Sequence, residues 1–239
     1  MLSILIPTYN NFDYFKLCIK SLETNTNNKY EIIVHVNDGI DGTLDFVKNK
    51  SFKYVHSKTN IGLCSSINKI AKISNYKYLL YSHDDMFFCP GWDKALIDEI
   101  EKIGHNNFYL SGTMIESNSG HIKFDAGKDI NSFNEQKLLD NVDNLNFFDH
   151  QGSHFAPHLV HKDLWDKVGG FSEEFNPGVA SDPDFNMKLW NLGIRIFKGI
   201  NDFKVYHFGS IVLRKKLNKM NNKSKFGSIG AKIFLLKWG

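Results

Sequence analysis

Two adjacent carboxylates, Asp84 and Asp85, are the residues whose types and spacing most directly suggest chemistry. They follow an apolar run at 78–81 and precede a Cys-Pro-Gly-Trp sequence at 89–92. A buried strand that ends in paired acids places them at the carboxyl edge of a sheet, where open α/β sheets bind ligands. Two like charges this close repel each other and raise one pKa unless a cation compensates, and a hard divalent metal bound to a diphosphate would do so. The alternative is a solvated loop that carries two acids.

The elements that would position these acids follow from the hydrophobic pattern of the first 105 residues. Short apolar runs alternate four times with segments whose apolar residues recur at helical spacing. This alternation implies a parallel sheet with right-handed crossovers, buried between helices because its strands are rich in Ile, Leu and Val. We therefore expect an α/β protein with a Rossmann-like, mixed but mostly parallel sheet flanked by helices. The expected strands are 3–6, 30–36, 53–55 and 78–81, and the expected helices are 12–22, 43–48, 63–71 and 92–103.

The order of elements loosens after residue 105. A polar, turn-prone stretch at 116–150 predicts a loop with a short helix near 135–139. A glycine, Gly193, is placed to end a late helix. The remaining expected strands are 108–115, one beginning at 159–160, 194–197 and 203–208, and the remaining helices are 164–168 and 182–192.

Composition bounds the class of protein. The chain has 239 residues, of which 42% are hydrophobic, so it can form one large α/β domain or two small ones. No apolar run approaches the roughly 18 residues that span a bilayer, and no basic region precedes the first apolar run as in a signal peptide. The three cysteines, Cys18, Cys64 and Cys89, have no CxxC spacing. We expect buried free thiols and a cytoplasmic protein.

Charge is distributed unevenly along the chain. From Phe203 to the end there are nine basic residues and no acid, which leaves 20 basic and 26 acidic residues before it and a net charge of −6 there. A basic C-terminal tail on a slightly acidic body suggests peripheral contact with anionic lipid or another polyanion. The alternative is a solvated lysine face. We expect no nucleic-acid partner.

Three motifs stand at the boundaries between the first strands and their helices. The first is Ser-Ile-Leu-Ile-Pro-Thr-Tyr-Asn at 3–10, the second is Val-Asn-Asp-Gly at 36–39 followed by Asp-Gly-Thr at 41–43, and the third is Asn-Ile-Gly at 60–62. In this order, and followed by two acids, they resemble family 2 glycosyltransferases, which have the GT-A fold. Ile40 stands where that family usually has Ser in its second motif. The resemblance covers nearly the whole chain.

The resemblance implies a set of nucleotide-binding residues. The loop after the first strand would border the nucleotide, and Asp38 would accept from a base N–H such as that of uracil. Asp38 can instead end a strand as an Asx-turn residue, and Asn10 and Asn60 can instead cap helices. The residues implied on the nucleotide side are Pro7, Thr8, Tyr9, Asn10, Asp38, Asn60 and Asp84.

The family's metal motif is usually Asp-x-Asp, whereas this chain has His-Asp-Asp-Met at 83–86. By resemblance to the two-Asp variant, Asp84 would reach the ribose and Asp85 would bind Mn²⁺ or Mg²⁺, which would neutralise the diphosphate leaving group. His207 follows a late strand, where relatives use a His to complete the metal site. A continuing strand would point His83 to the opposite side, so we expect a structural or acceptor-facing role for it.

The family's last motif is usually Glu-Asp-x-Asp, and this chain has Ser-Asp-Pro-Asp at 181–184, after Gly-Gly-Phe-Ser-Glu at 169–173. Asp182 matches the general base of an inverting transfer, which takes the proton of the acceptor hydroxyl. It can also be an N-cap with Pro183 at the first helical position. Asp184 is expected to interact with the helix dipole in the first turn.

A group of histidines lies between the metal motif and the expected base, in the region that forms the acceptor half in this family. A zinc site is one interpretation, although no carboxylate or cysteine completes a known spacing. The other interpretation, which the family favours, is that they line the acceptor pocket. The group consists of His154, His158 and His161.

These inferences combine into one expectation. Residues 1–239 would form a single GT-A domain with a nucleotide-sugar half at 1–105, an acceptor half at 106–210 and a basic tail at 211–239. It would transfer a sugar with inversion from a nucleoside diphosphate sugar, expected to be a UDP-sugar, to a hydroxyl of a glycan or lipid-linked acceptor. One alternative is a sugar nucleotidyltransferase, which needs a cationic, glycine-rich loop for a triphosphate that 7–10 does not offer. The other is a degenerate, non-catalytic binding module.

Overall fold

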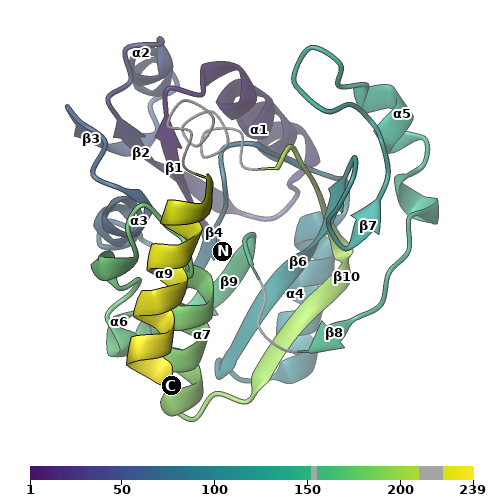
Figure 1. The fold of residues 1–239 in the computed structure, drawn as a ribbon. Helices are drawn as coiled ribbons and strands as arrows, with labels where there is room; N and C mark the ends of the chain where they lie inside the picture. The colour runs from purple at the N-terminus through teal and green to yellow at the C-terminus, as the bar shows by residue number, and fades with distance from the viewer. Residues whose placement is uncertain (152–154, 210–222) are drawn as a thin grey trace.

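One mixed sheet runs through the described part of the protein (Figure 1). The structure is a computed structural model and describes residues 1–151, 155–209 and 223–239. The main path of the sheet has the strand order β3-β2-β1-β4-β9-β6-β10-β5, with β7 paired to β6 and β8 paired to β10. Helices flank the sheet, which confirms the expected α/β class. His154, residue 210 at the end of the expected acceptor half, and residues 211–222 of the expected basic tail lie outside the described residues.

The first half of the chain forms the parallel part of the sheet. Strand β1 pairs in parallel with both β2 and β4, and β2 pairs with β3, as the alternating pattern predicted. Tyr9 lies opposite Asn37, so the ends of β1 and β2 meet at one edge. The elements are β1 (Leu2–Tyr9), α1 (Phe12–Asn25), β2 (Tyr30–Asn37), α2 (Thr43–Asn49), β3 (Lys53–Ser57), α3 (Leu63–Ala71) and β4 (Tyr78–Tyr81).

The second half inserts its strands beside β4. Strand β9 is antiparallel to both β4 and β6, whereas β10 is parallel to β6 and antiparallel to β5. The two expected strands at 194–197 and 203–208 form one strand, because a register shift between Gly199 and Lys204 lets β10 continue its pairing with β6. The elements are β5 (Met86–Phe88), α4 (Trp92–Ile103), β6 (Phe108–Glu116), β7 (Ile122–Lys123), α5 (Glu135–Leu139), η1 (Val142–Asn144), β8 (His150–Gln151), β9 (His158–His161), α6 (Lys162–Val168), η2 (Glu173–Phe175), α7 (Ser181–Asn191), β10 (Ile196–His207) and α9 (Lys223–Trp238).

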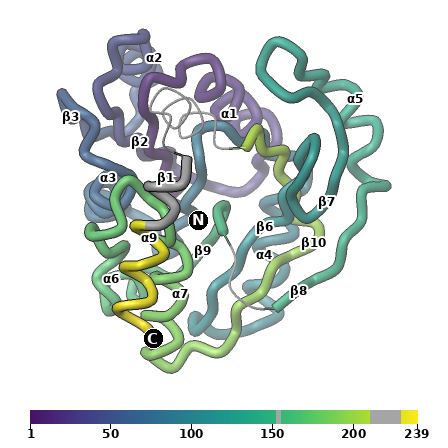
Figure 2. Tube along the Cα trace, in the orientation of Figure 1, coloured from purple at the N-terminus to yellow at the C-terminus, as the bar shows by residue number. Residues whose placement is uncertain are grey.

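Two hydrophobic clusters hold these elements together. The larger one fills the space between the sheet and helices α1, α3, α4, α6 and α7. The smaller one packs the long segment between β7 and β8 against β10, and Tyr206 donates to the carbonyl of Gly127 at 2.6 Å there. Figure 2 shows this segment, with the predicted short helix α5, running along one side of the molecule. Its packing explains how a polar stretch stays ordered beside the sheet.

The third sequence motif joins the two halves of the chain. Gly62, at the start of α3, has φ +89°, and a Cβ there would collide with the side chain of Asn176. Asn176 accepts the backbone N–H of Cys64 at 2.9 Å. One helix turn later, Asn68 exchanges two hydrogen bonds with the backbone of Phe171. The glycine is therefore required because a loop of the second half sits against the first turn of α3.

The described end of the basic tail packs as helix α9 beside α7 and η2 (Figures 1 and 2). Its anchor is Asp184, which is fully buried and accepts from Trp238 Nε1 at 2.9 Å and from Ser172 Oγ at 2.6 Å. Lys237 Nζ lies 2.9 Å from the same carboxylate. Asp184 therefore binds the C-terminal helix in addition to lying in the first turn of α7.

The three cysteines, Cys18, Cys64 and Cys89, are buried and free, as expected. Among the described helices, none combines the length and the apolar character that crossing a membrane requires.

Candidate active site

A cavity of about 490 Å³ opens at the carboxyl edge of the sheet. Its wall is built from the ends of β1, β2 and β10, the segment after β4, and the loop that leads into α7. This edge is where doubly wound α/β proteins bind ligands, because successive strand ends and their loops converge there. Eight of the ten residues that the sequence predicted for the site line it: Pro7, Thr8, Tyr9, Asn60, Asp84, Asp85, Asp182 and His207.

The other two residues predicted for the site, Asn10 and Asp38, bind each other beside the cavity. Asn10 Nδ2 donates to Asp38 Oδ2 at 3.0 Å, and Asn10 Oδ1 accepts the N–H of Gly39 at 3.1 Å. Both residues have positive φ, 45° and 64°, a conformation that Asn and Asp tolerate in tight turns. The pair therefore ties the loops that follow β1 and β2 to each other.

The alternative in which Asn60 caps the next helix is wrong, because the N-cap of α3 is Gly62. Asn60 Oδ1 accepts the N–H of Gly62 at 2.9 Å, which closes an Asx turn before α3. The side chain also lies along the cavity wall.

Asp84 is buried beneath the first-strand loop. Asn11 Nδ2 donates to its Oδ1 at 3.1 Å. Burial and the negative charge of Asp85 raise the pKa of Asp84. A cation, or a ligand hydroxyl that donates a hydrogen bond, would stabilise the ionised form of a carboxyl group in this position.

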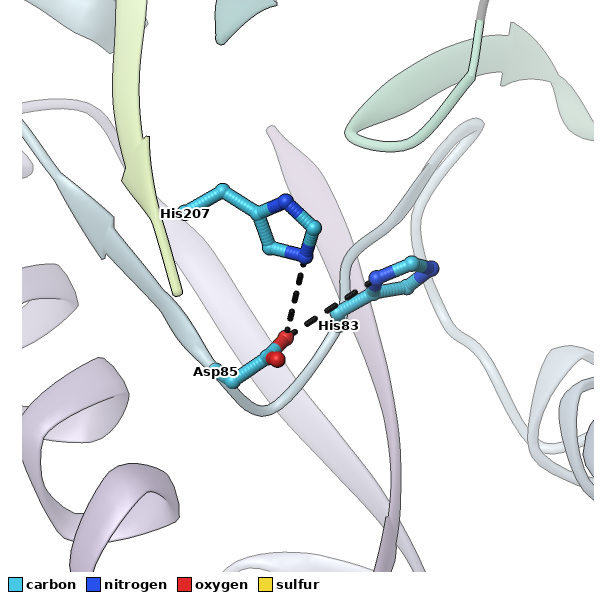
Figure 3. A group of neighbouring side chains, drawn as sticks. All are labelled: His83, Asp85 and His207. Atoms are coloured by element: carbon cyan, nitrogen blue, oxygen red, sulfur yellow. Dashed lines mark ion pairs between the residues drawn. The ribbon is translucent and has the colours of Figure 1, made fainter. Parts of the chain in front are cut away.

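Three side chains form a cluster that can hold a metal ion, and Figure 3 shows them converging. One ligand atom each from His83, Asp85 and His207 lies within 4.8 Å of the others. His207 Nε2 is 3.4 Å from Asp85 Oδ1, and His83 Nδ1 is 3.9 Å from the same oxygen. A metal ion held by two imidazole nitrogens and one carboxylate oxygen would keep further coordination positions for oxygen ligands of a substrate.

The expectation that His83 points to the side opposite the site is wrong. It considered only the alternation between His83 and Asp84, whereas residues 83 and 85 would share a face even in a continuing strand, and β4 in fact ends at Tyr81. The turn at 84–85 brings His83 to the same side as Asp85. Burial, together with the charge of His207, lowers the pKa of His83 to about 4 against the opposing effect of Asp85. The imidazole is therefore neutral near pH 7, as a metal ligand must be.

His207 is held between two carboxylates. Its Nδ1 lies 2.6 Å from Oε1 of Glu116, on the side opposite Asp85. Burial lowers the pKa of His207, but Asp85 and Glu116 raise it more, to about 9. Sequence analysis did not find Glu116, although an acid directly after the expected strand 108–115 repeats the signal that singled out Asp84 and Asp85.

Asp182 faces the cavity from the first turn of α7. The N-cap of this helix is Ala180, with φ 67°, so the alternative in which Asp182 caps the helix is wrong. Burial raises the pKa of Asp182 to about 7, and its Oδ1 has no hydrogen-bond partner among the described residues. A carboxyl group with one oxygen free of hydrogen bonds and a pKa near neutrality has the properties of a general base.

Behind Asp182 lies His158, whose Nδ1 is 3.7 Å from Asp182 Oδ1. His158 is buried against rings that include Tyr109 and Phe185, and burial lowers its pKa to about 3. His161 instead accepts the N–H of Asp163 and caps α6. Neither histidine lines the cavity or belongs to a metal-binding group within the described chain, so the acceptor-lining and zinc interpretations are not borne out for them.

Solved structures with the same fold identify the class of protein. S. aureus TarS, residues 1–349, matches with a TM-score of 0.64 at 19% identity, covering 86% of this chain and 60% of that one. GalNAc-T7 with UDP, GalNAc and Mn²⁺ matches with a TM-score of 0.66 at 14% identity, covering 87% and 43%. The sheet order and the acids at its carboxyl edge thus belong to a GT-A glycosyltransferase fold.

The family follows from the sequence. The family model described as glycosyl transferase family 2 matches residues 3–160, and the chain belongs to this family. An uncharacterized glycosyltransferase of Rickettsia bellii is 31% identical over 146 residues, 59% of this chain and 20% of the relative. The E. coli glycosyltransferase YibD is 33% identical over 89 residues, 35% of this chain and 26% of the relative. The chain therefore spans a minor part of the length of these relatives.

The raised pKa of Asp182 predicts a pH-dependent effect on stability. Its native pKa of about 7 exceeds the value of about 3.9 in an unfolded chain, so the native state binds more protons between these limits. The contribution of Asp182 to stability is therefore most favourable below pH 4 and is lost as the pH rises to 7. We expect Asp182→Asn to stabilise the protein by roughly 2 kcal/mol at pH 8, about 4–8 °C in Tm, and much less at pH 4.5.

Thermal unfolding at the two pH values measures this difference. The control is Asp166→Asn, which changes an exposed acid on α6 and is expected to shift Tm equally at both pH values. An Asp182→Asn shift that does not depend on pH would show that the carboxyl is not desolvated in the native state.

Proposed function

We propose that this protein transfers a sugar from a UDP-sugar to a hydroxyl of a glycan or lipid-linked acceptor, with inversion and with a divalent metal. The observation that carries the proposal is the placement of two chemically different groups in one cavity. A cluster of one carboxylate and two histidines that can hold a metal ion shares this cavity with Asp182, a carboxyl whose pKa is about 7. TarS with UDP-GlcNAc and GalNAc-T7 with UDP and Mn²⁺, which share the fold, support UDP as the nucleotide.

The metal would be held by His83, Asp85 and His207. Imidazole nitrogens suit transition metals better than Mg²⁺, whereas a carboxylate suits Mn²⁺ and Mg²⁺ alike. The donor set therefore favours Mn²⁺ of the two expected ions. When bound, the ion would neutralise the charge that develops on the diphosphate leaving group.

Asp182 would act as the general base. As the acceptor oxygen bonds to the anomeric carbon, the bond from that carbon to the diphosphate breaks on the opposite face, and the acceptor proton moves to Asp182. A base with a pKa near the working pH is both ionised and basic enough for this step. The buried aromatic side chains behind Asp182 keep water from that side of the carboxyl, which sustains the raised pKa.

The nucleotide would lie along the loop after β1. Pro7, Thr8 and Tyr9 line the cavity there, and Asp84 lies next to the metal cluster, where it can accept from a ribose hydroxyl. The Asn10–Asp38 pair would contact the base at the edge of this cavity. In this arrangement the base, the ribose and the diphosphate would follow one another from β2 toward β10.

The cavity disfavours one of the rival functions. A sugar nucleotidyltransferase must compensate a triphosphate, yet among the described residues no Lys or Arg lines the cavity. The degenerate binding module differs from the proposal in lacking turnover. The retained base and metal cluster favour catalysis, and turnover assays separate the two.

Replacing the base tests the mechanism directly. Asp182→Asn keeps the size of the side chain but removes its ability to take a proton, so UDP release from the active UDP-sugar should fall by about 10²–10⁴-fold. The Kd for UDP with Mn²⁺ should stay within a few-fold of that of the wild type, because Asp182 lies on the acceptor side. Asp166→Asn serves as control. Turnover of Asp182→Asn close to that of the wild type would contradict the assignment of Asp182 as the general base.

Metal dependence gives a second test. EDTA should abolish UDP release and Mn²⁺ should restore it better than Mg²⁺. His83→Ala and His207→Ala should each weaken Mn²⁺ binding, measured by titration calorimetry, by at least tenfold. His105→Ala, an exposed histidine in a loop, should leave the affinity unchanged. UDP release that continues in EDTA contradicts the metal-dependent mechanism.

We also propose that the C-terminal tail contacts the anionic surface of a membrane. On the described part of α9, Ile229, Leu235 and Leu236 are 51%, 62% and 89% exposed. The chain from Phe203 onward carries nine basic residues and no acid. Exposed apolar side chains next to basic ones are typical of helices that lie on anionic bilayers.

Vesicle co-sedimentation tests this contact. The protein should bind vesicles that contain anionic phosphatidylglycerol several-fold better than neutral vesicles, and salt should weaken the binding. The double variant Leu235→Ser/Leu236→Ser should reduce it, whereas Ile40→Ser, which changes a side chain 83% exposed beyond β2, should not. Equal binding to neutral and anionic vesicles would contradict the proposal.

A further inference from the structure

Glu116 lies beside the metal cluster without belonging to it. It is the last residue of β6, and Ile115 pairs with Tyr206 of β10, so the next residues along both strands, Glu116 and His207, stand abreast. Glu116 Oε1 is 2.6 Å from His207 Nδ1, and the Glu116 side chain is 12% exposed. This distance is typical of a charge-assisted hydrogen bond in which the ring N–H donates to the carboxylate.

Backbone pairing on two sides holds Glu116 in this position. It lies opposite Lys123 of β7, and its carbonyl accepts the N–H of Phe124 at 2.9 Å. Its second carboxylate oxygen, Oε2, accepts from Ser119 Oγ in the turn between the two strands. The carboxylate is therefore fixed before any ligand binds, and it faces His207 from a strand that contributes no predicted metal ligand.

The hydrogen bond determines which nitrogen of His207 is available. When Nδ1–H donates to Glu116, the lone pair of the neutral ring is on Nε2, and Nε2 is the atom 3.4 Å from Asp85 Oδ1. Ligating histidines commonly donate their other N–H to a carboxylate, which orients the ring and strengthens it as a donor.

We propose that Glu116 is a positioning residue for the metal site, which acts by fixing the tautomer and orientation of His207. The inference rests on the proposed metal-dependent function. It adds a residue from β6 to a site whose other members come from β10 and from the segment between β4 and β5. A purely structural ion pair between β6 and β10 is the competing explanation, and it predicts no effect that depends on the metal.

Mn²⁺ binding to the full chain, measured by titration calorimetry with Mn²⁺ alone and with Mn²⁺ plus UDP, distinguishes these explanations. Glu116→Ala removes the acceptor and should weaken Mn²⁺ binding about 10–100-fold. Glu116→Gln keeps an acceptor oxygen but not the charge, so its affinity should lie between those of Glu116→Ala and the wild type. The unfolding temperature without metal should change little in Glu116→Gln.

Two controls make the assignment specific. Glu99→Gln changes a carboxylate of the same exposure, 12%, that pairs with Lys198 near the other end of β10, and it should leave Mn²⁺ binding unchanged. In a His207→Ala background, Glu116→Ala should cause no further loss, because a residue that acts only through His207 has nothing left to position.

The outcomes separate the inference from the function on which it rests. Wild-type protein that binds no Mn²⁺ in either condition overturns both. Wild-type protein that binds Mn²⁺ while Glu116→Ala binds it equally well overturns the positioning role alone. A loss in Glu116→Ala that persists undiminished in the His207→Ala background also overturns it, whereas a loss that disappears there supports it.

Discussion

The pairing of β10 with both β5 and β6 is the interaction on which the candidate site depends. It carries His207 from late in the chain to the turn that holds Asp85, because His207 lies opposite Met86 at the start of β5. The same strand meets β6 on its other side, which brings in Glu116. The register of β10 against β6 shifts at the bulge between Gly199 and Lys204, and the pairing after this shift brings Glu116 abreast of His207. Without the pairing of β10 with β5 and β6, the candidate metal cluster would lose the imidazole of His207 and the carboxylate of Glu116 together.

Buried carboxyl groups lie close together at the carboxyl edge of the sheet, an arrangement that is unfavourable in a core with a purely structural role. Asp84 and Asp182 both have raised pKa values, and both stand in a cavity that no described Lys or Arg lines. Burial of a carboxylate without a cationic partner destabilises the native state, so such groups mark positions where a ligand is expected to compensate. The two carboxyls lie on different walls of the cavity, which suits separate tasks for donor and acceptor.

The placement of Asp182 depends on contacts from both directions along the chain. Two residues further on, Asp184 is buried and binds Trp238 and Ser172, so the first turn of α7 is fixed by the C-terminal helix and by the segment before η2. Asn176, in the loop leading to α7, is in turn held against the first turn of α3. Donor-side and acceptor-side elements are thereby linked through α3, α7 and α9, which keeps Asp182 facing the metal cluster across one cavity.

The order of strands and helices in the first 105 residues, and the acids at their ends, could be read from the sequence because periodicity and strand-end motifs are local properties. The family resemblance placed Asp85, His207 and Asp182 at one site, and all three line one cavity. The convergence of His83 and Asp85 on His207, the contact of Glu116 with His207 and the burial of Asp184 under α9 were decided only by the tertiary structure. Each depends on where a strand stops or on which distant segments pair, because hydrogen bonds and desolvation act between residues that are close in space but far apart in the chain.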